Sequence, residues 1–207
     1  MYPTLQQCKS LSKTYNRIPI YKQLNISQPG LLLLLKSFIN NGDCIFFESA
    51  KQNKKQSRFS FLGFNPAQTL YFAPPHIVIC NSSKSASISC SDPFDFIDEY
   101  ISRYHSPSFK RFGSYNGGLS GYFSYDLVNY TGHLRQRIHE DTLHPLMVLH
   151  HIDDFICYDN KYNTYYIATC LYTDTGDIET QYNKAKSKLQ LLEEDIIKTI
   201  ASTALPY

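Results

Sequence analysis

Short apolar segments separated by turn residues follow one another along most of this chain. Runs such as residues 44–47, 69–73 and 77–80 are too short for independent helices and are rich in β-branched and aromatic side chains. Such side chains suit a pleated sheet, and 17 tyrosines and 13 phenylalanines supply them in number. Because short turns join neighbouring runs, antiparallel pairing is expected. The pattern predicts an α+β fold with mainly antiparallel sheets. The expected strands are 44–47, 58–64, 69–73, 77–80, 86–90, 119–125, 147–158 and 162–172, and residues 17–23 are expected to form an extended entry segment.

Three segments carry helical signals. A buried helix is expected over 31–39, with Ser27 as its cap, Pro29 in its first turn and a stop at Asn41-Gly42. A second helix, over 93–104, follows the capping residue Asp92 and places Phe94, Ile97, Tyr100 and Ile101 on one face. The last helix has the clearest periodicity and is interpreted as an amphipathic helix docked on a sheet. Its apolar residues are Ile178, Tyr182, Ala185, Leu189, Leu192, Ile196 and Ile200.

Composition excludes several classes of protein. The formal net charge of +2 gives no electrostatic case for nucleic acid. The longest apolar run, 31–35, is far short of the roughly 20 residues that span a bilayer, so no membrane association is expected. The start lacks the features of a secretory signal, and the six cysteines are scattered, so we expect reduced thiols and a cytoplasmic location. No repeat or linker divides the chain, which predicts a single domain over 1–207.

General catalytic and metal-binding motifs are missing from the sequence. It contains no nucleophile elbow, P-loop, zinc-protease helix or full dinucleotide-binding fingerprint. The cluster Gly117-Gly118-x-x-Gly121 predicts close backbone packing at the start of a strand. His150-His151 and Asp153-Asp154 lie on an expected strand, where adjacent side chains point to opposite faces. Neither pair is therefore expected to converge on one ion.

The segment 44–66, CIFFESAKQNKKQSRFSFLGFNP, combines an apolar strand, a polar loop and a second apolar strand. By simple physics it is a hairpin with a hydrated loop, and Glu48 is a surface carboxylate. The segment also closely resembles the signature of the N-terminal domain of anthranilate synthase component I, in which L-L-E-S precedes a loop and R-Y-S-F-I-G follows it. Further motifs of that family have counterparts in the same order from about residue 17 to residue 200. The matching stretches are IPIYK at 18–22, FFES at 46–49, RFSFLG at 58–63, GGLSGYFSYD at 117–126, and HPL to FICYD between 144 and 159, where Leu146 replaces an aspartate of the family.

The resemblance implies a fold and an activity. In that family the N-terminal domain has two packed antiparallel sheets with a few flanking helices. The whole subunit turns chorismate and ammonia into anthranilate and pyruvate with magnesium, and a glutamine amidotransferase subunit supplies the ammonia. On this resemblance, the chorismate-binding catalytic domain, which holds the magnesium, is expected to be absent from this chain. We therefore expect no catalytic residue, metal ligand or cofactor in this chain, and no synthase activity from it alone.

The resemblance also implies part of a feedback-inhibition site for L-tryptophan. Position by position, the matching residues are Phe46, Phe47, Glu48 and Ser49, with Arg58 facing across the hairpin. With the apolar neighbours Ala50 and Phe59, the expected ligand-binding residues are Glu48, Ser49, Ala50, Arg58 and Phe59. Glu48 would accept a charge-assisted hydrogen bond from the ligand ammonium group, and Arg58 would offer its planar fork to the ligand carboxylate. Apolar neighbours would enclose the indole. Because the second wall of the pocket belongs to the catalytic domain, we expect weak tryptophan binding or none by this chain alone.

Other readings remain open at this stage. Component I of aminodeoxychorismate synthase has the same fold, although its corresponding segment usually departs from E-S-A. A stand-alone amino-acid-binding regulatory domain is a second alternative, and a structural domain with a vestigial pocket is a third. Phe46 and Phe47 replace two leucines of the family motif, so a tryptophan-insensitive member is also compatible with the sequence.

Overall fold

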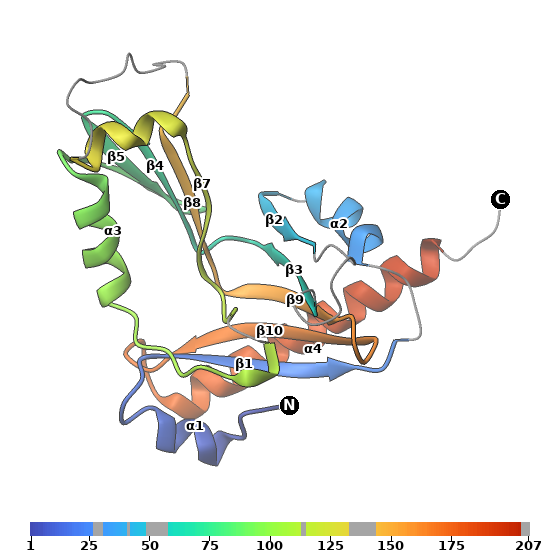
Figure 1. The fold of residues 1–207 in the computed structure, drawn as a ribbon. Helices are drawn as coiled ribbons and strands as arrows, with labels where there is room; N and C mark the ends of the chain where they lie inside the picture. Colours follow the sequence, from blue (N-terminus) through green and yellow to red (C-terminus); the bar gives the residue numbers. More distant parts are fainter. Residues whose placement is uncertain (27–30, 41, 49–57, 113–114, 133–143, 204–207) are drawn as a thin grey trace. The chain divides into compact units, whose positions relative to one another are not determined.

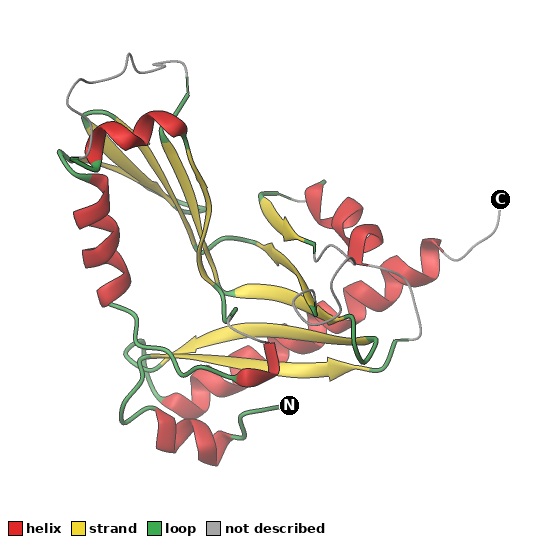
Figure 2. Ribbon diagram, in the orientation of Figure 1, coloured by secondary structure: helices red, strands yellow, loops and turns green. Residues whose placement is uncertain are grey.

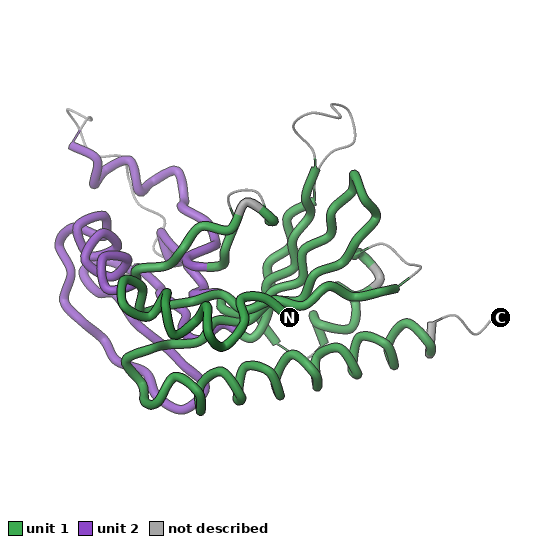
Figure 3. The backbone as a smooth tube through the Cα atoms, turned by 90° about the horizontal axis from the view of Figure 1, so that it is seen from below, with its two compact units in different colours: residues 1–65, 105–117, 153–207 green, residues 66–104, 118–152 purple. Residues whose placement is uncertain are grey.

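The fold consists of two five-stranded antiparallel sheets and a few helices (Figures 1 and 2). The structure is a computed structural model and describes residues 1–26, 31–40, 42–48, 58–112, 115–132 and 144–203. It confirms the predicted α+β class with antiparallel sheets. The chain divides into two compact units, each with one sheet (Figure 3). Unit 1 comprises residues 1–65, 105–117 and 153–207, and unit 2 comprises 66–104 and 118–152. Both units are built from separated segments, and the single domain over 1–207 stays a prediction.

The sheet of unit 1 has the strand order β1-β10-β9-β3-β2. The β2–β3 hairpin was predicted, and its register pairs Phe47 with Phe61. β3 also pairs with β9, whereas β1 pairs with β10 along its whole length. The strand bounds are β1 Arg17–Leu24, β2 Cys44–Phe47, β3 Phe59–Phe64, β9 Asp154–Asp159 and β10 Thr164–Tyr172.

Helices cover one face of this sheet. They are α1 (Leu5–Leu11), α2 (Leu31–Ile39) and α4 (Ile178–Thr203). The predicted apolar face of α4 is confirmed, because Ala185, Leu189 and Ile196 are buried in the core with β1 and β10. α2 has the predicted bounds, but its expected cap, Ser27, and Pro29 lie outside the described residues. α1 was not predicted.

The other face of the unit 1 sheet carries aromatic side chains. Phe112, from the segment 105–117, is fully buried and packs edge-on against Tyr21, Phe155 and Tyr166. Tyr115 packs against Phe155 with ring centroids 5.3 Å apart. Among the described residues, this face therefore carries rings from β1, β9, β10 and one crossing segment, in which residues Lys110–Phe112 form a 3-10 helix.

The described residues of unit 2 form the second sheet, in the order β6-β5-β4-β8-β7, and the helix α3. The strands are β4 Gln68–Ala73, β5 His76–Cys80, β6 Ser85–Ser89, β7 Gly118–Phe123 and β8 Met147–Ile152. The helix α3 (Pro93–Ser102) starts at the predicted cap, because the Asp92 carboxylate accepts bonds from the amides of Phe94 and Asp95. Ile97 and Tyr100 are buried as predicted. The prediction that Ile101 lies on the buried face of the helix was wrong, because its side chain is 48% exposed. Ile101 lies on the side of α3 that faces away from the core residues of β4 and β8.

One predicted strand is in fact two. The expected strand 147–158 divides at Asp153 into β8, in the sheet of unit 2, and β9, in the sheet of unit 1. The apolar pattern continues across the break because both strands bury side chains on both faces. The expected strand 119–125 also ends early, at Phe123, and a 3-10 helix follows over Tyr125–Tyr130.

Glycine 121 confirms the predicted close packing. A Cβ atom at this position would lie 1.9 Å from the carbonyl oxygen of Val148 on the neighbouring strand β8. Backbone atoms cannot yield as a flexible side chain would, so only glycine fits.

The six cysteines are all free thiols, as predicted. Within the described part of the chain, no helix is long and apolar enough to cross a membrane.

Candidate functional site

The hairpin of β2 and β3 carries the residues that the sequence analysis selected. Glu48 directly follows β2 and is exposed, and Arg58 directly precedes β3. Glu48 makes no hydrogen bond or ion pair with any residue that the structure describes. Ser49 and Ala50 lie outside the described residues. The structure thus places Glu48, Arg58 and Phe59 at one end of a single hairpin, and their role as ligand-binding residues stays a prediction.

Arg58 is held by a carboxylate of its own chain. Its Nε atom donates to both oxygens of Asp159, at 3.0 and 3.1 Å, and its Nη2 atom donates to Oδ2 at 2.6 Å. These hydrogen bonds raise the pKa of the Arg58 guanidinium above its ordinary value. Asp159 is fully buried at the end of β9. The edge of the Arg58 guanidinium formed by Nε and Nη2 therefore binds Asp159, and Nη1 does not take part in these bonds to Asp159.

The turn after β9 fixes the backbone of Arg58 as well. The amide of Asn160 donates to the Arg58 carbonyl at 2.8 Å, and the Asn160 side chain donates to the same oxygen at 3.1 Å and to Ser60 Oγ at 3.2 Å. The Asp159 carboxylate also accepts from the amide of Lys161. Residues 159–161 lie between the expected strands 147–158 and 162–172. In the structure this turn also orients Arg58.

A row of aromatic rings lies beside these polar groups. It comprises Phe47, Phe59, Phe61 and Tyr115, and we call it the β2–β3 aromatic row. The ring of Tyr115 lies 4.6 Å from that of Phe61 and 6.3 Å from that of Phe47, and the rings of Phe59 and Phe61 are 6.2 Å apart. Phe47 is 45% exposed, and Phe59 is half-buried. The row offers flat apolar surface beside the Arg58 guanidinium, whose Cζ atom lies 4.6 Å from the ring centre of Phe59, and Glu48 directly follows Phe47 in the chain. An aromatic amino acid requires apolar surface together with charged partners for its ammonium and carboxylate groups.

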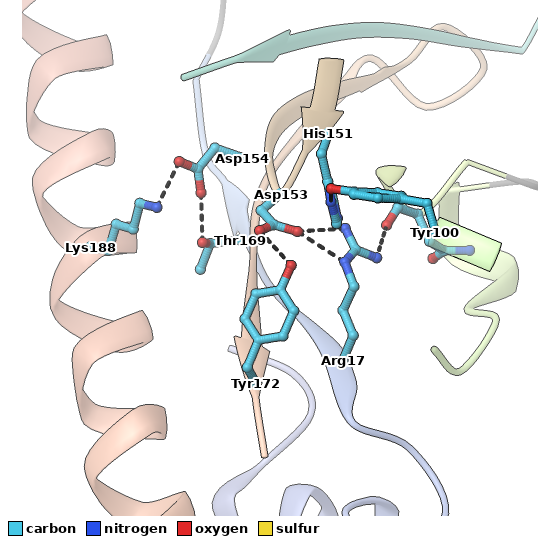
Figure 4. Close-up of polar contacts among 9 residues, drawn as sticks. Arg17, Tyr100, His151, Asp153, Asp154, Thr169, Tyr172 and Lys188 are labelled. Atoms are coloured by element: carbon cyan, nitrogen blue, oxygen red, sulfur yellow. Dashed lines mark hydrogen bonds and ion pairs between the residues drawn. The ribbon is translucent and has the colours of Figure 1, made fainter. Parts of the chain in front are cut away.

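A second polar cluster of unit 1 was not predicted (Figure 4). Asp153, at the break between β8 and β9, accepts bonds from Arg17 Nε at 2.9 Å and Nη2 at 2.8 Å, and from the Tyr172 hydroxyl at 2.8 Å. Arg17 also donates to the carbonyl of Asn116. Burial, and then the negative charge of Asp153, raise the pKa of Tyr172, which keeps the hydroxyl protonated as a donor. No motif links these residues in the sequence, because Arg17 and Asp153 are far apart along the chain.

Asp154 points the other way, as strand geometry requires. Its carboxylate accepts from Thr169 Oγ1 at 2.6 Å and pairs with Lys188 of α4 at 2.7 Å (Figure 4). In unit 2, His150 bonds with Thr69, whereas the Nδ1 atom of His151 lies 2.7 Å from the Tyr100 hydroxyl. The two histidines of His150-His151 thus have different partners, and so do the two aspartates of Asp153-Asp154. Among the described residues, no group of three or more His, Cys, Asp or Glu side chains could hold a metal ion, so nothing here fits magnesium.

Comparison with known proteins gives several relatives named anthranilate synthase component 1. No family model matches the chain. It is 26% identical over 98% of its length to anthranilate synthase component 1 of Acetivibrio thermocellus, and 26% identical over 99% of its length to that of Saccharomyces cerevisiae. A relative of the same name from Pseudomonas aeruginosa is 28% identical over 90% of the chain.

The matched part is a fraction of each relative. The chain spans 41% of the Acetivibrio protein, 40% of the yeast protein and 38% of the Pseudomonas protein. A crystal structure of anthranilate synthase component I from Streptococcus pneumoniae covers 79% of the chain, with a TM-score of 0.50 and 20% identity, over 32% of its own length. The structural likeness supports the fold, and the sequence likeness runs through almost the whole chain. This chain matches an N-terminal domain of the anthranilate synthase component I family.

Proposed function

We propose that the chain is the N-terminal regulatory part of an anthranilate synthase large subunit. Sequence similarity to proteins of that name over nearly all of its length carries the proposal. In this proposal, a catalytic domain with its magnesium converts chorismate and ammonia to anthranilate and pyruvate. A glutamine amidotransferase subunit supplies the ammonia. We assign no catalytic residue here.

The regulatory role is assigned to the end of the β2–β3 hairpin. L-tryptophan would bind there through Glu48, Ser49, Ala50, Arg58 and Phe59. The exposed carboxylate of Glu48 suits the ligand ammonium group, because ions of opposite charge form the stronger hydrogen bonds. The ring of Phe59, with the rest of the β2–β3 aromatic row, suits the indole.

Arg58 would contribute differently from the expectation. Since its fork is bound to the buried carboxylate of Asp159, a ligand carboxylate would meet the outer Nη1 atom and not the bidentate edge. The pairing with Asp159 would also hold the guanidinium in place before the ligand arrives, which reduces the ordering cost of binding. Inhibition would follow if tryptophan binds one state of the enzyme better than another, because only differential affinity shifts an equilibrium.

The identity of the reaction product tests the enzyme assignment. The natural protein that carries this sequence, incubated with chorismate, ammonia and magnesium, should yield anthranilate, the ortho isomer, as separated by chromatography. Formation of the para-substituted product would assign the chain to aminodeoxychorismate synthase instead. Absence of either product, in a protein shown to be folded, would favour a stand-alone regulatory domain.

Substitution of Ser49 tests the inhibitor site. In the same protein, Ser49→Phe should abolish inhibition by tryptophan while the rate without tryptophan stays that of the wild type, because a bulky ring would fill the site without touching catalytic groups. Glu194→Gln, at an exposed position on α4, is the matched surface control and should remain inhibited. Retained inhibition in Ser49→Phe would refute the assigned site.

A further inference from the structure

Unit 1 contains a pocket that the proposed regulatory role does not use. It has a volume of about 470 Å³ and lies beside β1 and β10, where the N-terminal residues and the segment 105–117 meet the sheet. This volume is within the range of pockets that hold small organic ligands, about 300–1,000 Å³. The residues that matter for its chemistry are Tyr2, Tyr21, Gln23, Phe109, Arg111 and Tyr166.

Aromatic rings form the floor and one wall of this pocket. Tyr21 and Tyr166 are buried, with 8% and 4% of their surfaces exposed, so they form the floor. The rings of Tyr2 and Phe109 lie 5.6 Å apart at 76°, and each also packs against Tyr21. Tyr2 is fixed by two backbone hydrogen bonds with Tyr21, at 2.9 and 2.8 Å. The rings are therefore held in place and give the apolar part of a recess that is open to solvent.

The charge in the recess comes from a guanidinium. The Cζ atom of Arg111 lies 5.6 Å above the ring centre of Tyr166. The hydroxyl groups of Tyr21 and Tyr166 raise the pKa of the Arg111 guanidinium, with Tyr21 the larger cause. An arginine carries five N–H donors, more than these two contacts use. The lining contains no carboxylate. An aromatic recess can hold a cation, but here the fixed positive charge opposes one and favours an anion.

We propose that this pocket binds a planar aromatic carboxylate. The ligand ring would lie against Tyr2 and Phe109, where edge-to-face contacts with aromatic rings are favourable. The ligand carboxylate would accept charge-assisted hydrogen bonds from Arg111, whose planar guanidinium matches its geometry. Gln23, at the exposed edge, is a further donor within the lining.

The pocket is separate from the β2–β3 hairpin. The sheet order is β1-β10-β9-β3-β2, so β1 and β2 are its two opposite edges. The pocket lies at the β1 edge and Glu48 follows the β2 edge. Its ligand can therefore be tested without reference to tryptophan inhibition.

Binding of 2-naphthoate to the full chain tests the proposal. The ligand fluoresces, and the chain has no tryptophan of its own. Saturable binding is expected, with 2-naphthamide, the neutral analogue, binding about tenfold more weakly or worse, because a hydrogen bond to a charged group is stronger than a neutral one. The cationic 2-naphthylmethylammonium should not bind. Equal affinity for the carboxylate and the amide, or no saturable binding of the carboxylate, would overturn the proposal.

Variants assign the binding to this pocket. Arg111→Gln should weaken naphthoate binding about tenfold and leave the amide unchanged, and Arg111→Lys should recover part of the loss. Arg111 is exposed, so its replacement should leave the melting temperature unchanged. Arg103→Gln, an exposed arginine on a different element, and Glu48→Gln are controls and should bind as the wild type does. Unchanged binding in Arg111→Gln, or equal loss in Glu48→Gln, would contradict a separate pocket at Arg111.

Discussion

Replacement of Asp153 by asparagine should destabilise the protein far more than the same change one residue later. In Asp153→Asn, the side chain keeps its shape but loses the charge that balances Arg17. The Arg17 side chain is only 4% exposed and that of Asp153 only 11%, so water cannot take over the lost interaction. Breaking a buried ion pair from one side costs about 3–5 kcal/mol.

The retained amide oxygen of the variant can still accept one hydrogen bond from Arg17, which places the expected loss at the lower end, about 3 kcal/mol. For a protein of this size each kcal/mol lowers the melting temperature by about 2–4 °C, so the expected fall is about 6–12 °C. Thermal unfolding followed by circular dichroism measures this directly. Urea unfolding of the same variant gives the corresponding change in free energy.

Asp154→Asn is the matched control, because Asp154 is adjacent and equally part of an ion pair. Its partner Lys188 has a side chain that is 56% exposed, so the ammonium group can return to water when the carboxylate is removed. We expect a change within about 1 kcal/mol of the wild type. If the two variants lose equal unfolding free energy, or if Asp154→Asn loses more, then burial of the cation does not determine how much stability is lost.

Two further changes test the fold and its electrostatics. Burial raises the pKa of Asp154 despite Lys188 and Thr169, so the folded state holds this proton more tightly than the unfolded state. The contribution of Asp154 to the unfolding free energy is therefore complete below about pH 3.9 and is lost as pH rises through the pKa of the folded state. Urea titrations at several pH values should show that the unfolding free energy of Asp154→Asn, relative to that of the wild type, rises between these two pKa values. A difference between variant and wild type that does not change with pH would contradict the raised pKa of Asp154. Gly121→Ala should lower the unfolding free energy by about 1–3 kcal/mol or more, since its Cβ would meet the carbonyl of Val148 at 1.9 Å; an unchanged urea midpoint would show that β7 can move away.

Local sequence patterns predicted most individual elements. The apolar spacing of α4 located its buried face, and Asp92 marked the start of α3. The strands of the β2–β3 hairpin lay within one residue of their predicted bounds. These features depend on residues close together in sequence, which is why periodicity and caps reveal them.

Features that depend on long-range pairing were not predictable in the same way. The break at Asp153 is hidden because β8 and β9 both bury their side chains, so the apolar run continues while the chain changes sheets. The helix α1 was missed although Thr4 and Gln7 form a capping box, since few apolar residues follow them. The partner of Arg58 could be found only from the fold, because Asp159 is brought beside it by the pairing of β3 with β9.

Glu48, directly after β2, is proposed to bind the ammonium group of tryptophan. The most direct test is the tryptophan concentration that halves the rate of anthranilate formation by the natural protein, compared between wild type and Glu48→Gln. Loss of a charge-assisted hydrogen bond predicts an increase of about tenfold or more, with the uninhibited rate unchanged. An unchanged concentration for half-inhibition would contradict the account.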